Sequence, residues 1–351
     1  MSNSHDLVDW SLAVRVASTV AGRGPETTPD LRADVRKDFK RFTHESDELV
    51  RDFTGLVAPQ AAPDPIVLDR AGWVRANVES FQGLIKPLAE KLSGSVNLRG
   101  PMRRVTAGAI GVQVGVLLGY LSQKVLGQYD LVLATEGAGR VYFVGPNVVD
   151  IERRLGFTPA DFRFWITIHE ITHRTQFTGV PWLRERVRAL VEKAIGGMEI
   201  DPANVRRIFE RGKELFLKGP SAWRSASLMQ ILMSDEQRAL LDEMQALMCV
   251  VEGHGTFVMN RLGARLIPTF ETMRDAVEAR RGGATGAERT LQRAIGMEMK
   301  YDQYAIGERF MDAVAERAGL DAVNKVWESE ATMPTLAEMR APEAWLSRVG
   351  V

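Results

Sequence analysis

The sequence predicts a mainly α-helical fold with one small β-hairpin or sheet. Apolar residues recur at helical spacing through most of the 351-residue chain, and glycine and proline separate the helical stretches. Strand-forming residues concentrate in two short runs, 131–135 and 140–144, which a glycine-containing turn at 136–139 joins. Because no internal repeat or low-complexity tract indicates another architecture, we expect a short strand pair among many helices.

The apolar segment 105–121 is predicted to be a helix buried inside a soluble core. Gly111, Gly115 and Gly119 are spaced four residues apart, which lets two helix backbones approach closely. A membrane span is the alternative, but Gln113 interrupts the segment, its length is at the lower limit for spanning, and no second apolar stretch accompanies it. We expect the glycines to mark a crossing with another helix, for which the helix at 158–179 is a candidate.

The predicted hairpin at 131–144 lies directly before that helix in the sequence. The edge of such a sheet can bind an extended peptide by strand addition. A hairpin that only stabilises the fold explains the same pattern equally well, so both interpretations stay open.

The segment 158–179 is predicted to be a buried helix. It begins with Thr158-Pro159-Ala160-Asp161 and ends near Thr178-Gly179-Val180-Pro181, which are ordinary start and stop signals. The residues that recur at helical spacing are Phe162, Trp165, Ile166, His169, His173 and Phe177. The two histidines therefore lie on an apolar face, where each imidazole nitrogen needs a partner.

The five residues His169-Glu170-Ile171-Thr172-His173 match what a catalytic zinc site requires of one helix. Residues i and i+4 share a face, so both imidazoles can reach one tetrahedral ion. Glu170 lies about 100° around the helix, where it can reach a water molecule as a general base. The alternative is a helix whose two histidines form only local hydrogen bonds.

A second apolar run, 246–251, supplies the expected third ligand. The run is apolar on all sides, which predicts a fully buried helix, and Glu252 follows it directly. A buried carboxylate is unfavourable unless it is paired, hydrogen-bonded or metal-bound. Two histidines and a glutamate form an established catalytic zinc set, so we expect Glu252 to complete the ligands. The alternative is a core helix with an internal Glu–Arg ion pair.

His254 is kept as a reserve ligand, or as a group that supports a ligand. Positions i and i+2 point about 200° apart on an unbroken helix, so Glu252 and His254 cannot both reach one ion from it. Gly253 and Gly255 could break the helix and remove that restriction.

Glu192 is predicted to be solvated, although it follows His173 by a plausible distance. Leu183, Val187 and Leu190 define one apolar stripe, and Glu192 projects about 180° away from that stripe.

Composition limits the remaining classes of function. The 45 basic and 45 acidic residues give a net charge of zero, so nothing in the charge favours nucleic acid or an anionic membrane as a partner. The single cysteine, Cys249, excludes an intramolecular disulfide framework and a cysteine-rich zinc site. Residues 1–10 lack the basic start and apolar run of a secretory signal, so we expect a cytoplasmic protein without a membrane span. The oligomeric state is left open.

Several stretches of the chain together carry a family resemblance. They are His169-Glu170-x-x-His173-Arg174-x-Gln176-Phe177, Val180-Pro181-Trp182-Leu183-Arg184, Val251-Glu252-Gly253-His254, and the segments at 69–77, 126–130, 303–310, 326–328 and 334–336. Over about residues 10–349 the sequence resembles an actinobacterial family of zincin-like metallopeptidases, often labelled as associated with biosynthesis of the deazaflavin coenzyme. The resemblance implies a zincin-like helical metallohydrolase fold without naming a substrate.

We expect a single zincin-like domain over residues 1–350. The 45% hydrophobic content of this chain can form one large core or two smaller ones. A division into two lobes therefore stays open, with an N-terminal helical lobe at about 1–145 that includes the hairpin, and a zinc-site lobe at 146–350.

The predicted function is hydrolysis by one zinc ion per chain. Zinc lowers the pKa of its water to about 7, Glu170 accepts the proton, and the hydroxide attacks the carbonyl of a peptide or small amide. Tyr304 is a candidate to stabilise the oxyanion, as are Tyr301, His254 and Arg174. Two alternatives stay open. One is a non-catalytic zinc-binding relative with a closed site, and the other is an accessory protein that binds a partner in a coenzyme pathway.

Overall fold

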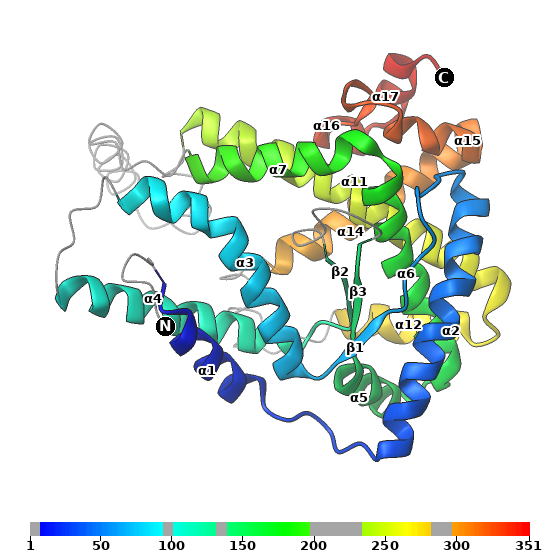
Figure 1. The fold of residues 1–351 in the computed structure, drawn as a ribbon. Helices are drawn as coiled ribbons and strands as arrows, with labels where there is room; N and C mark the ends of the chain where they lie inside the picture. The colour runs from blue at the N-terminus through cyan, green and yellow to red at the C-terminus, as the bar shows by residue number, and fades with distance from the viewer. Residues whose placement is uncertain (1–7, 94–100, 131–138, 197–233, 282–296) are drawn as a thin grey trace, which may run out of the picture.

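Helices make up most of this computed structural model, which describes residues 8–93, 101–130, 139–196, 234–281 and 297–351. A small sheet lies among them (Figure 1). The predicted mainly α fold is therefore confirmed. The elements are α1 (Trp10–Ala21), α2 (Pro29–Thr54), β1 (Ile66–Leu68), α3 (Arg70–Ser93), α4 (Pro101–Ser122), β2 (Gly127–Tyr129), β3 (Val141–Val144), α5 (Gly145–Leu155), α6 (Pro159–Gly179), α7 (Pro181–Gly196), α11 (Asp235–Leu266), α12 (Phe270–Arg281), α14 (Met297–Ala318), α15 (Leu320–Val323), the 3₁₀ helices η1 (Asn324–Trp327) and η2 (Glu330–Thr332), α16 (Leu336–Arg340) and α17 (Pro342–Val349).

The sheet has three strands in the order β1-β3-β2, with β1 parallel and β2 antiparallel to β3. The strand predicted at 140–144 is present as β3. Its antiparallel partner among the described residues is β2 at 127–129, while the predicted partner at 131–135 lies outside the described residues. The parallel strand β1 was not predicted, because three residues are too few to show a strand period.

The register of the sheet determines which peptide groups of β2 face outward. The N–H of Val144 donates to the carbonyl of Leu126 at 2.9 Å, so these two residues form a hydrogen-bonded pair. Alternate residues of an antiparallel strand bond to the same neighbour. The peptide groups of Gly127 and Tyr129 therefore point away from β3, toward the outer edge of the sheet.

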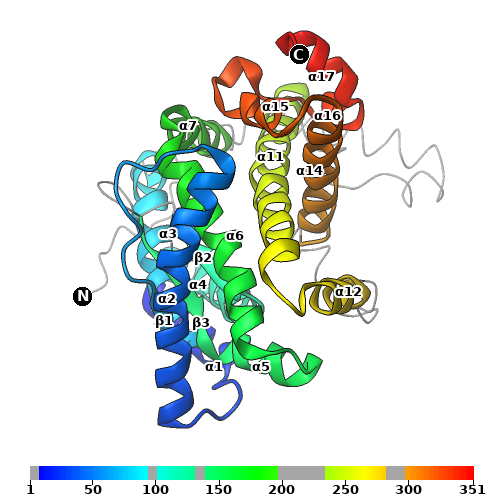
Figure 2. The ribbon, with the colours of Figure 1, turned by 90° about the vertical axis from the view of Figure 1, so that its right-hand side faces the viewer.

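Helix α6 lies between α2 and α11 and contacts both (Figure 2). It begins at Pro159 after the N-cap residue Thr158 and ends at Gly179, as the sequence predicted. Arg163 anchors it to the helices on one side. This guanidinium donates to both carboxylate oxygens of Glu152 at 2.8 Å and to Asp38 at 2.9 Å.

Helix α11 is continuous through the segment where a break was considered possible. It runs from Asp235 to Leu266, and its residues 246–258 are buried with the exception of Met248. Gly253 serves close packing instead, because a Cβ on it would collide with the backbone of Gly307 in α14. The prediction of a buried helix here is confirmed, and the interpretation of the glycines as helix breakers is wrong.

The three glycines of α4 mark a helix crossing, but the partner is α1 and not α6. A Cβ on Gly111 would lie 2.6 Å from the carbonyl oxygen of Asp9, and one on Gly119 would lie 2.6 Å from Cβ of Val20. Sequence spacing predicts such a crossing, but it cannot identify the helix on the other side.

The outward face of α4 is not buried. Of the described helices, α4 contains one segment, Arg104–Ser122, that is long and apolar enough to cross a membrane by length and composition, and 28% of that segment is buried. Val105, Val112 and Val116 are exposed. The expectation that a core encloses this helix is therefore wrong for the outward face of α4. The absence of a membrane span stays a prediction.

The packing of α1 on α4 predicts that Gly115→Ala lowers thermal stability. The added Cβ would lie 2.7 Å from the carbonyl oxygen of Ala13 and 2.8 Å from Cβ of Val16. Forcing a methyl group into such a contact costs about 1–3 kcal/mol. Thermal unfolding followed by circular dichroism measures the effect.

Gly108→Ala is the matched control on the same helix, because its Cβ would meet only Cδ2 of Leu12 at 3.9 Å. Both variants gain the helix propensity of alanine, so that contribution cancels when they are compared. We expect a Tm for Gly108→Ala at or above that of the wild type and clearly above that of Gly115→Ala. Equal Tm values for the two variants would contradict the assigned packing role.

Candidate metal centre

The two histidines of the sequence motif lie one turn apart on α6, with their ring nitrogens facing each other. The Nε2 atoms of His169 and His173 are 3.0 Å apart, and the rings meet edge to face. Their side chains are 14% and 12% exposed, so the two imidazoles are largely enclosed without being sealed from solvent.

Glu252 of α11 reaches these nitrogens from the opposite helix. Its Oε2 atom lies 3.4 Å from Nε2 of His173 and 3.7 Å from Nε2 of His169. Among the described residues, this trio is the group of histidine, cysteine or acidic side chains whose donor atoms gather closely enough to hold a metal.

The donor set and its spacing fit a zinc ion. Ligand atoms at about 2.0–2.1 Å from a tetrahedral zinc are separated from one another by about 3.3 Å. The observed separations of 3.0, 3.4 and 3.7 Å lie around that value. Two imidazoles with one carboxylate also form a donor set that zinc uses in catalytic sites. The structure thus brings together the residues expected from the sequence, and their role as ligands is proposed below.

Gly255 gives the two imidazoles the room to lie beside α11. A Cβ at this position would be 3.0 Å from Cε1 of His169 and 3.0 Å from Cε1 of His173. These contacts are tighter than ordinary van der Waals distances, so a larger residue would push the rings away. The glycine thereby allows α6 and α11 to approach at the level of the donor atoms.

Glu170 is buried against the sheet. A Cβ on Gly127 of β2 would lie 2.5 Å from Cγ and 2.6 Å from Oε1 of Glu170. The missing side chain on β2 therefore makes the space that the carboxylate uses, directly beside the outer edge of the sheet.

The charges of the site act on His173. Burial alone would lower the pKa of His173, but the carboxylate of Glu252 and then that of Glu170 raise it above its ordinary value. The centre is therefore negative enough to favour a positive charge at the position of the donor atoms.

His254 lies behind the donor atoms instead of among them. Its Nδ1 atom is 2.9 Å from Nε2 of Gln176, and its ring makes a T-shaped contact with the ring of Trp327. Burial, together with the charge of His173, lowers the pKa of His254 to about 3, so the ring is neutral near pH 7. Of the two roles left open for His254, this arrangement corresponds to the supporting one.

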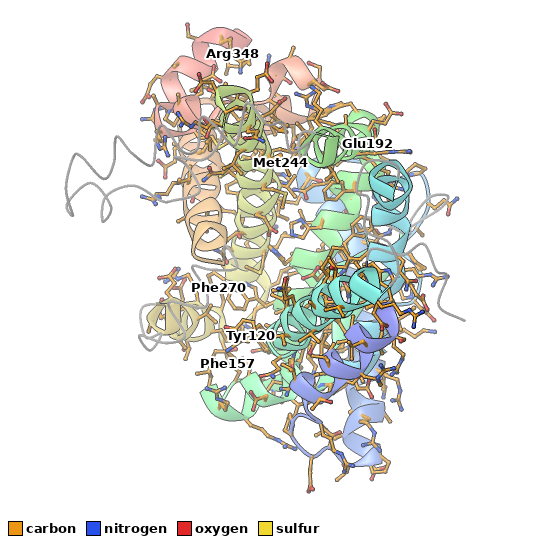
Figure 3. All side chains as sticks on the ribbon, turned by 90° about the vertical axis from the view of Figure 1, so that its left-hand side faces the viewer. Tyr120, Phe157, Glu192, Met244, Phe270 and Arg348 are labelled. Carbon is orange, nitrogen blue, oxygen red and sulfur yellow. The ribbon has the colours of Figure 1, made fainter. Side chains whose placement is uncertain are left out.

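Arg174 and Glu192, which were also considered from the sequence, bond to partners other than the donor atoms. Arg174 is fully buried and donates to Asp47 at 2.8 Å and to the carbonyl of Gln60 at 2.5 Å. Glu192 lies on the surface of α7, as predicted (Figure 3). It accepts a hydrogen bond from Arg188 at 2.9 Å. Tyr304 belongs to α14, but its side chain lies outside what the structure describes.

Three residues of the centre were missed by the sequence analysis: Gly127, Gly255 and Gln176. The two glycines act through contacts between segments far apart in the chain, so local spacing carries no signal for them. Gln176 lies three positions after His173 on the same helix, but its bonds to Val251 and His254 also join distant segments. Gly255 had been noted, but only for its effect on helix continuity. The absence of a side chain at the two glycines becomes informative once the neighbouring helix or strand is known.

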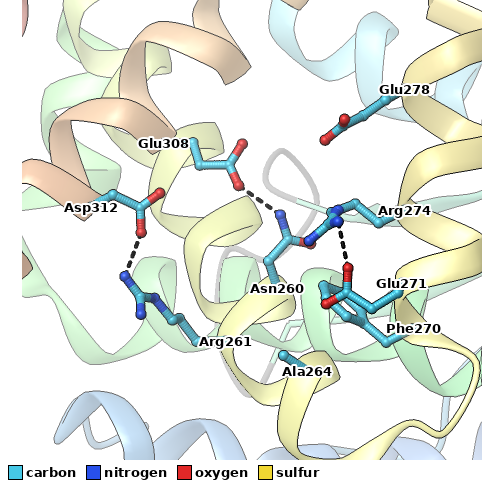
Figure 4. Close-up of a pocket in the computed structure, with 9 residues that line it drawn as sticks. All are labelled: Asn260, Arg261, Ala264, Phe270, Glu271, Arg274, Glu278, Glu308 and Asp312. Atoms are coloured by element: carbon cyan, nitrogen blue, oxygen red, sulfur yellow. Dashed lines mark hydrogen bonds and ion pairs between the residues drawn. The ribbon is translucent and has the colours of Figure 1, made fainter.

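A separate surface pocket of about 400 Å³ lies between α11, α12 and α14 (Figure 4). Two pairs of its polar side chains bond to one another. Asn260 donates to Glu308 at 2.6 Å, and Arg261 donates to Asp312 at 2.7 Å. None of the candidate metal ligands lines this pocket.

Comparisons with known proteins agree with the geometry. A family model for zincin-like metallopeptidases matches residues 8–346. The chain is also similar to a crystal structure of a "putative hydrolase with a novel fold" from Chloroflexus aurantiacus, with 32% sequence identity, a TM-score of 0.73, and coverage of 98% of this chain and 99% of that chain. A comparison with curated proteins found no match. The chain therefore belongs to the zincin-like metallopeptidase family.

Proposed function

We propose that the protein is a zinc-dependent hydrolase of peptide or small amide bonds. His169, His173 and Glu252 hold the ion, and Glu170 is the general base. The observation that carries the proposal is the triangle of donor atoms at 3.0, 3.4 and 3.7 Å, which two helices form beside a buried carboxylate. Family membership and the similarity to a structure described as a hydrolase support the same class of reaction.

The zinc ion and Glu170 have distinct roles in this reaction. Bound zinc supplies Lewis-acid polarisation and lowers the pKa of a water molecule to about 7. Glu170 accepts the proton of the attacking water, since its carboxylate lies on the same helix as the histidine ligands and is enclosed by the sheet. The closed surroundings of Glu170 strengthen its interaction with a developing charge.

An extended peptide fits the edge of the sheet. The peptide groups of Gly127 and Tyr129 point outward from β2, and Gly127 is in contact with Glu170. A peptide that pairs with this edge as an additional strand would carry its carbonyl groups past the general base. This placement favours a peptide over a compact small molecule as substrate.

The main alternative is a zinc protein without catalysis. Structural zinc sites are closed by a fourth protein ligand, whereas a catalytic site keeps one position open. Within the described residues, His254 is the candidate for a fourth ligand, but it is bonded to Gln176 and lies outside the triangle of donor atoms. This arrangement favours a catalytic zinc site over a structural one. A role as an accessory protein in deazaflavin coenzyme biosynthesis rests on the sequence resemblance alone.

Glu170→Gln tests the general base. We expect the variant to keep one equivalent of zinc and to lose hydrolysis by a factor of about 10²–10⁴, because an amide cannot accept the proton. Metal analysis of the purified protein, paired with peptide-library digestion followed by mass spectrometry, measures both quantities. Unchanged turnover in this variant would show that Glu170 is not the general base. A wild-type protein that takes up no zinc would contradict the proposed metal site.

Gly127→Ala tests the contact between β2 and Glu170. The new Cβ would collide with the carboxylate side chain and displace it, so we expect turnover to fall at least tenfold while zinc stays bound. Gly83→Ala on α3 is the control, since its Cβ would meet open space. Wild-type turnover in the Gly127 variant would show that the position of Glu170 does not depend on this contact.

Gly255→Ala tests the metal centre from the opposite helix. Its Cβ would press on both imidazole rings, at a cost of about 1–3 kcal/mol if the rings keep their places. We expect zinc affinity to drop about tenfold or more, as measured by competition with a chromophoric chelator. Gly108→Ala, far from the site on α4, should bind zinc as the wild type does. Equal affinities in these two variants would argue against zinc binding at the histidine pair.

A further inference from the structure

The side-chain amide of Gln176 lies at the centre of the hydrogen bonds behind His173. The residue is fully buried on α6, three positions after the histidine. Its Oε1 atom is 2.9 Å from Nδ1 of His173. Its Nε2 atom is 3.1 Å from the carbonyl oxygen of Val251 and 2.9 Å from Nδ1 of His254. The amide thereby connects a proposed ligand on α6 with two residues of α11.

The orientation of this amide follows from the carbonyl group of Val251. A backbone carbonyl only accepts hydrogen bonds, so the NH₂ group of Gln176 must face it. The Oε1 atom then faces His173, and because an amide oxygen also only accepts, Nδ1 of His173 must carry the proton. A neutral imidazole that is protonated at Nδ1 has its lone pair at Nε2, which is the atom in the donor triangle.

We propose that Gln176 is a positioning residue that holds His173 in the Nδ1–H tautomer and so directs the Nε2 lone pair to the metal. This inference rests on the proposed zinc site. Metal-binding histidines generally need a partner for the second ring nitrogen, which fixes both the tautomer and the ring orientation. Here that partner is an uncharged amide.

The same amide fixes the alignment of the two helices that carry the donor atoms. Val251 and His254 flank Glu252 on α11, so both hydrogen bonds of the NH₂ group hold the stretch that presents the carboxylate. The second hydrogen of the amide requires Nδ1 of His254 to be unprotonated. One side chain therefore links the tautomer of one ligand to the position of another.

Gln176→Met tests this role by removing both the acceptor and the donors while keeping a side chain of similar length. We expect zinc affinity to weaken roughly 10- to 100-fold, in line with the loss of other hydrogen-bond partners of metal-bound histidines. Chelator competition measures the Kd. Thr175→Val is the matched control, since Thr175 is buried on the same helix and bonds only to the carbonyl of Ile171 in the described structure.

Gln176→Glu separates the two functions of the amide. A carboxylate still accepts the Nδ1–H proton of His173, but it cannot donate to Val251. We expect this variant to lose less zinc affinity than Gln176→Met, because it keeps the acceptor for His173, while its Tm falls because the bond to Val251 is lost. A zinc Kd for Gln176→Glu as weak as that of Gln176→Met, or a wild-type Kd in Gln176→Met, would overturn the proposal.

A direct measurement on the wild type covers the case in which the variants do not fold. Long-range ¹H–¹⁵N NMR of the metal-free protein, above the titration range of histidine, reports which ring nitrogen of His173 carries the proton. We expect Nδ1–H, and a finding of Nε2–H would overturn the inference. This readout needs no metal, so it stays informative even if zinc fails to bind and the proposed function is lost.

Discussion

The close approach of α6 and α11 is the constraint on which the metal centre depends. Helix α6 supplies only two of the three donor atoms. The third belongs to Glu252 of α11, about eighty residues later in the sequence. Gly255 permits this approach, since any larger residue would meet both imidazole rings. Each helix is supported from behind. α14 touches α11 at Gly253, and α2 holds α6 through the partly buried ion pair of Arg174 with Asp47.

Burial explains why the polar groups of the centre are so closely connected. A carboxylate and two imidazoles withdrawn from water are unfavourable unless hydrogen bonds, opposite charges or a metal compensate them. Gln176 and His254 provide hydrogen bonds without adding charge, so the negative charge near the donor atoms comes from Glu252 and Glu170. A divalent cation would balance this arrangement, and its binding should in turn strengthen the docking of α6 on α11.

Local geometry explains which parts of the site were predictable from the sequence. The spacing of His169 and His173 on one helix face follows from the period of an α-helix, and Glu252 was identified because a carboxylate beside a fully apolar run needs a partner. Contacts between distant segments have no such local signal. The pairing of α1 with α4, the role of Gln176 and the space left by Gly127 all depend on how elements meet. The same applies to β2, whose sequence Gly-Gln-Tyr lacks the β-branched residues that mark strands.

The central claim is that two imidazoles of α6 and one carboxylate of α11 bind a single zinc ion. X-ray absorption spectroscopy at the zinc edge of the loaded protein tests it most directly, because the scattering of imidazole rings reveals how many are bound. The geometry predicts two imidazoles together with carboxylate oxygen at about 2.0–2.2 Å. Three bound imidazoles would place His254 on the metal, and a single one would separate the histidine pair. Either result would contradict the site described here.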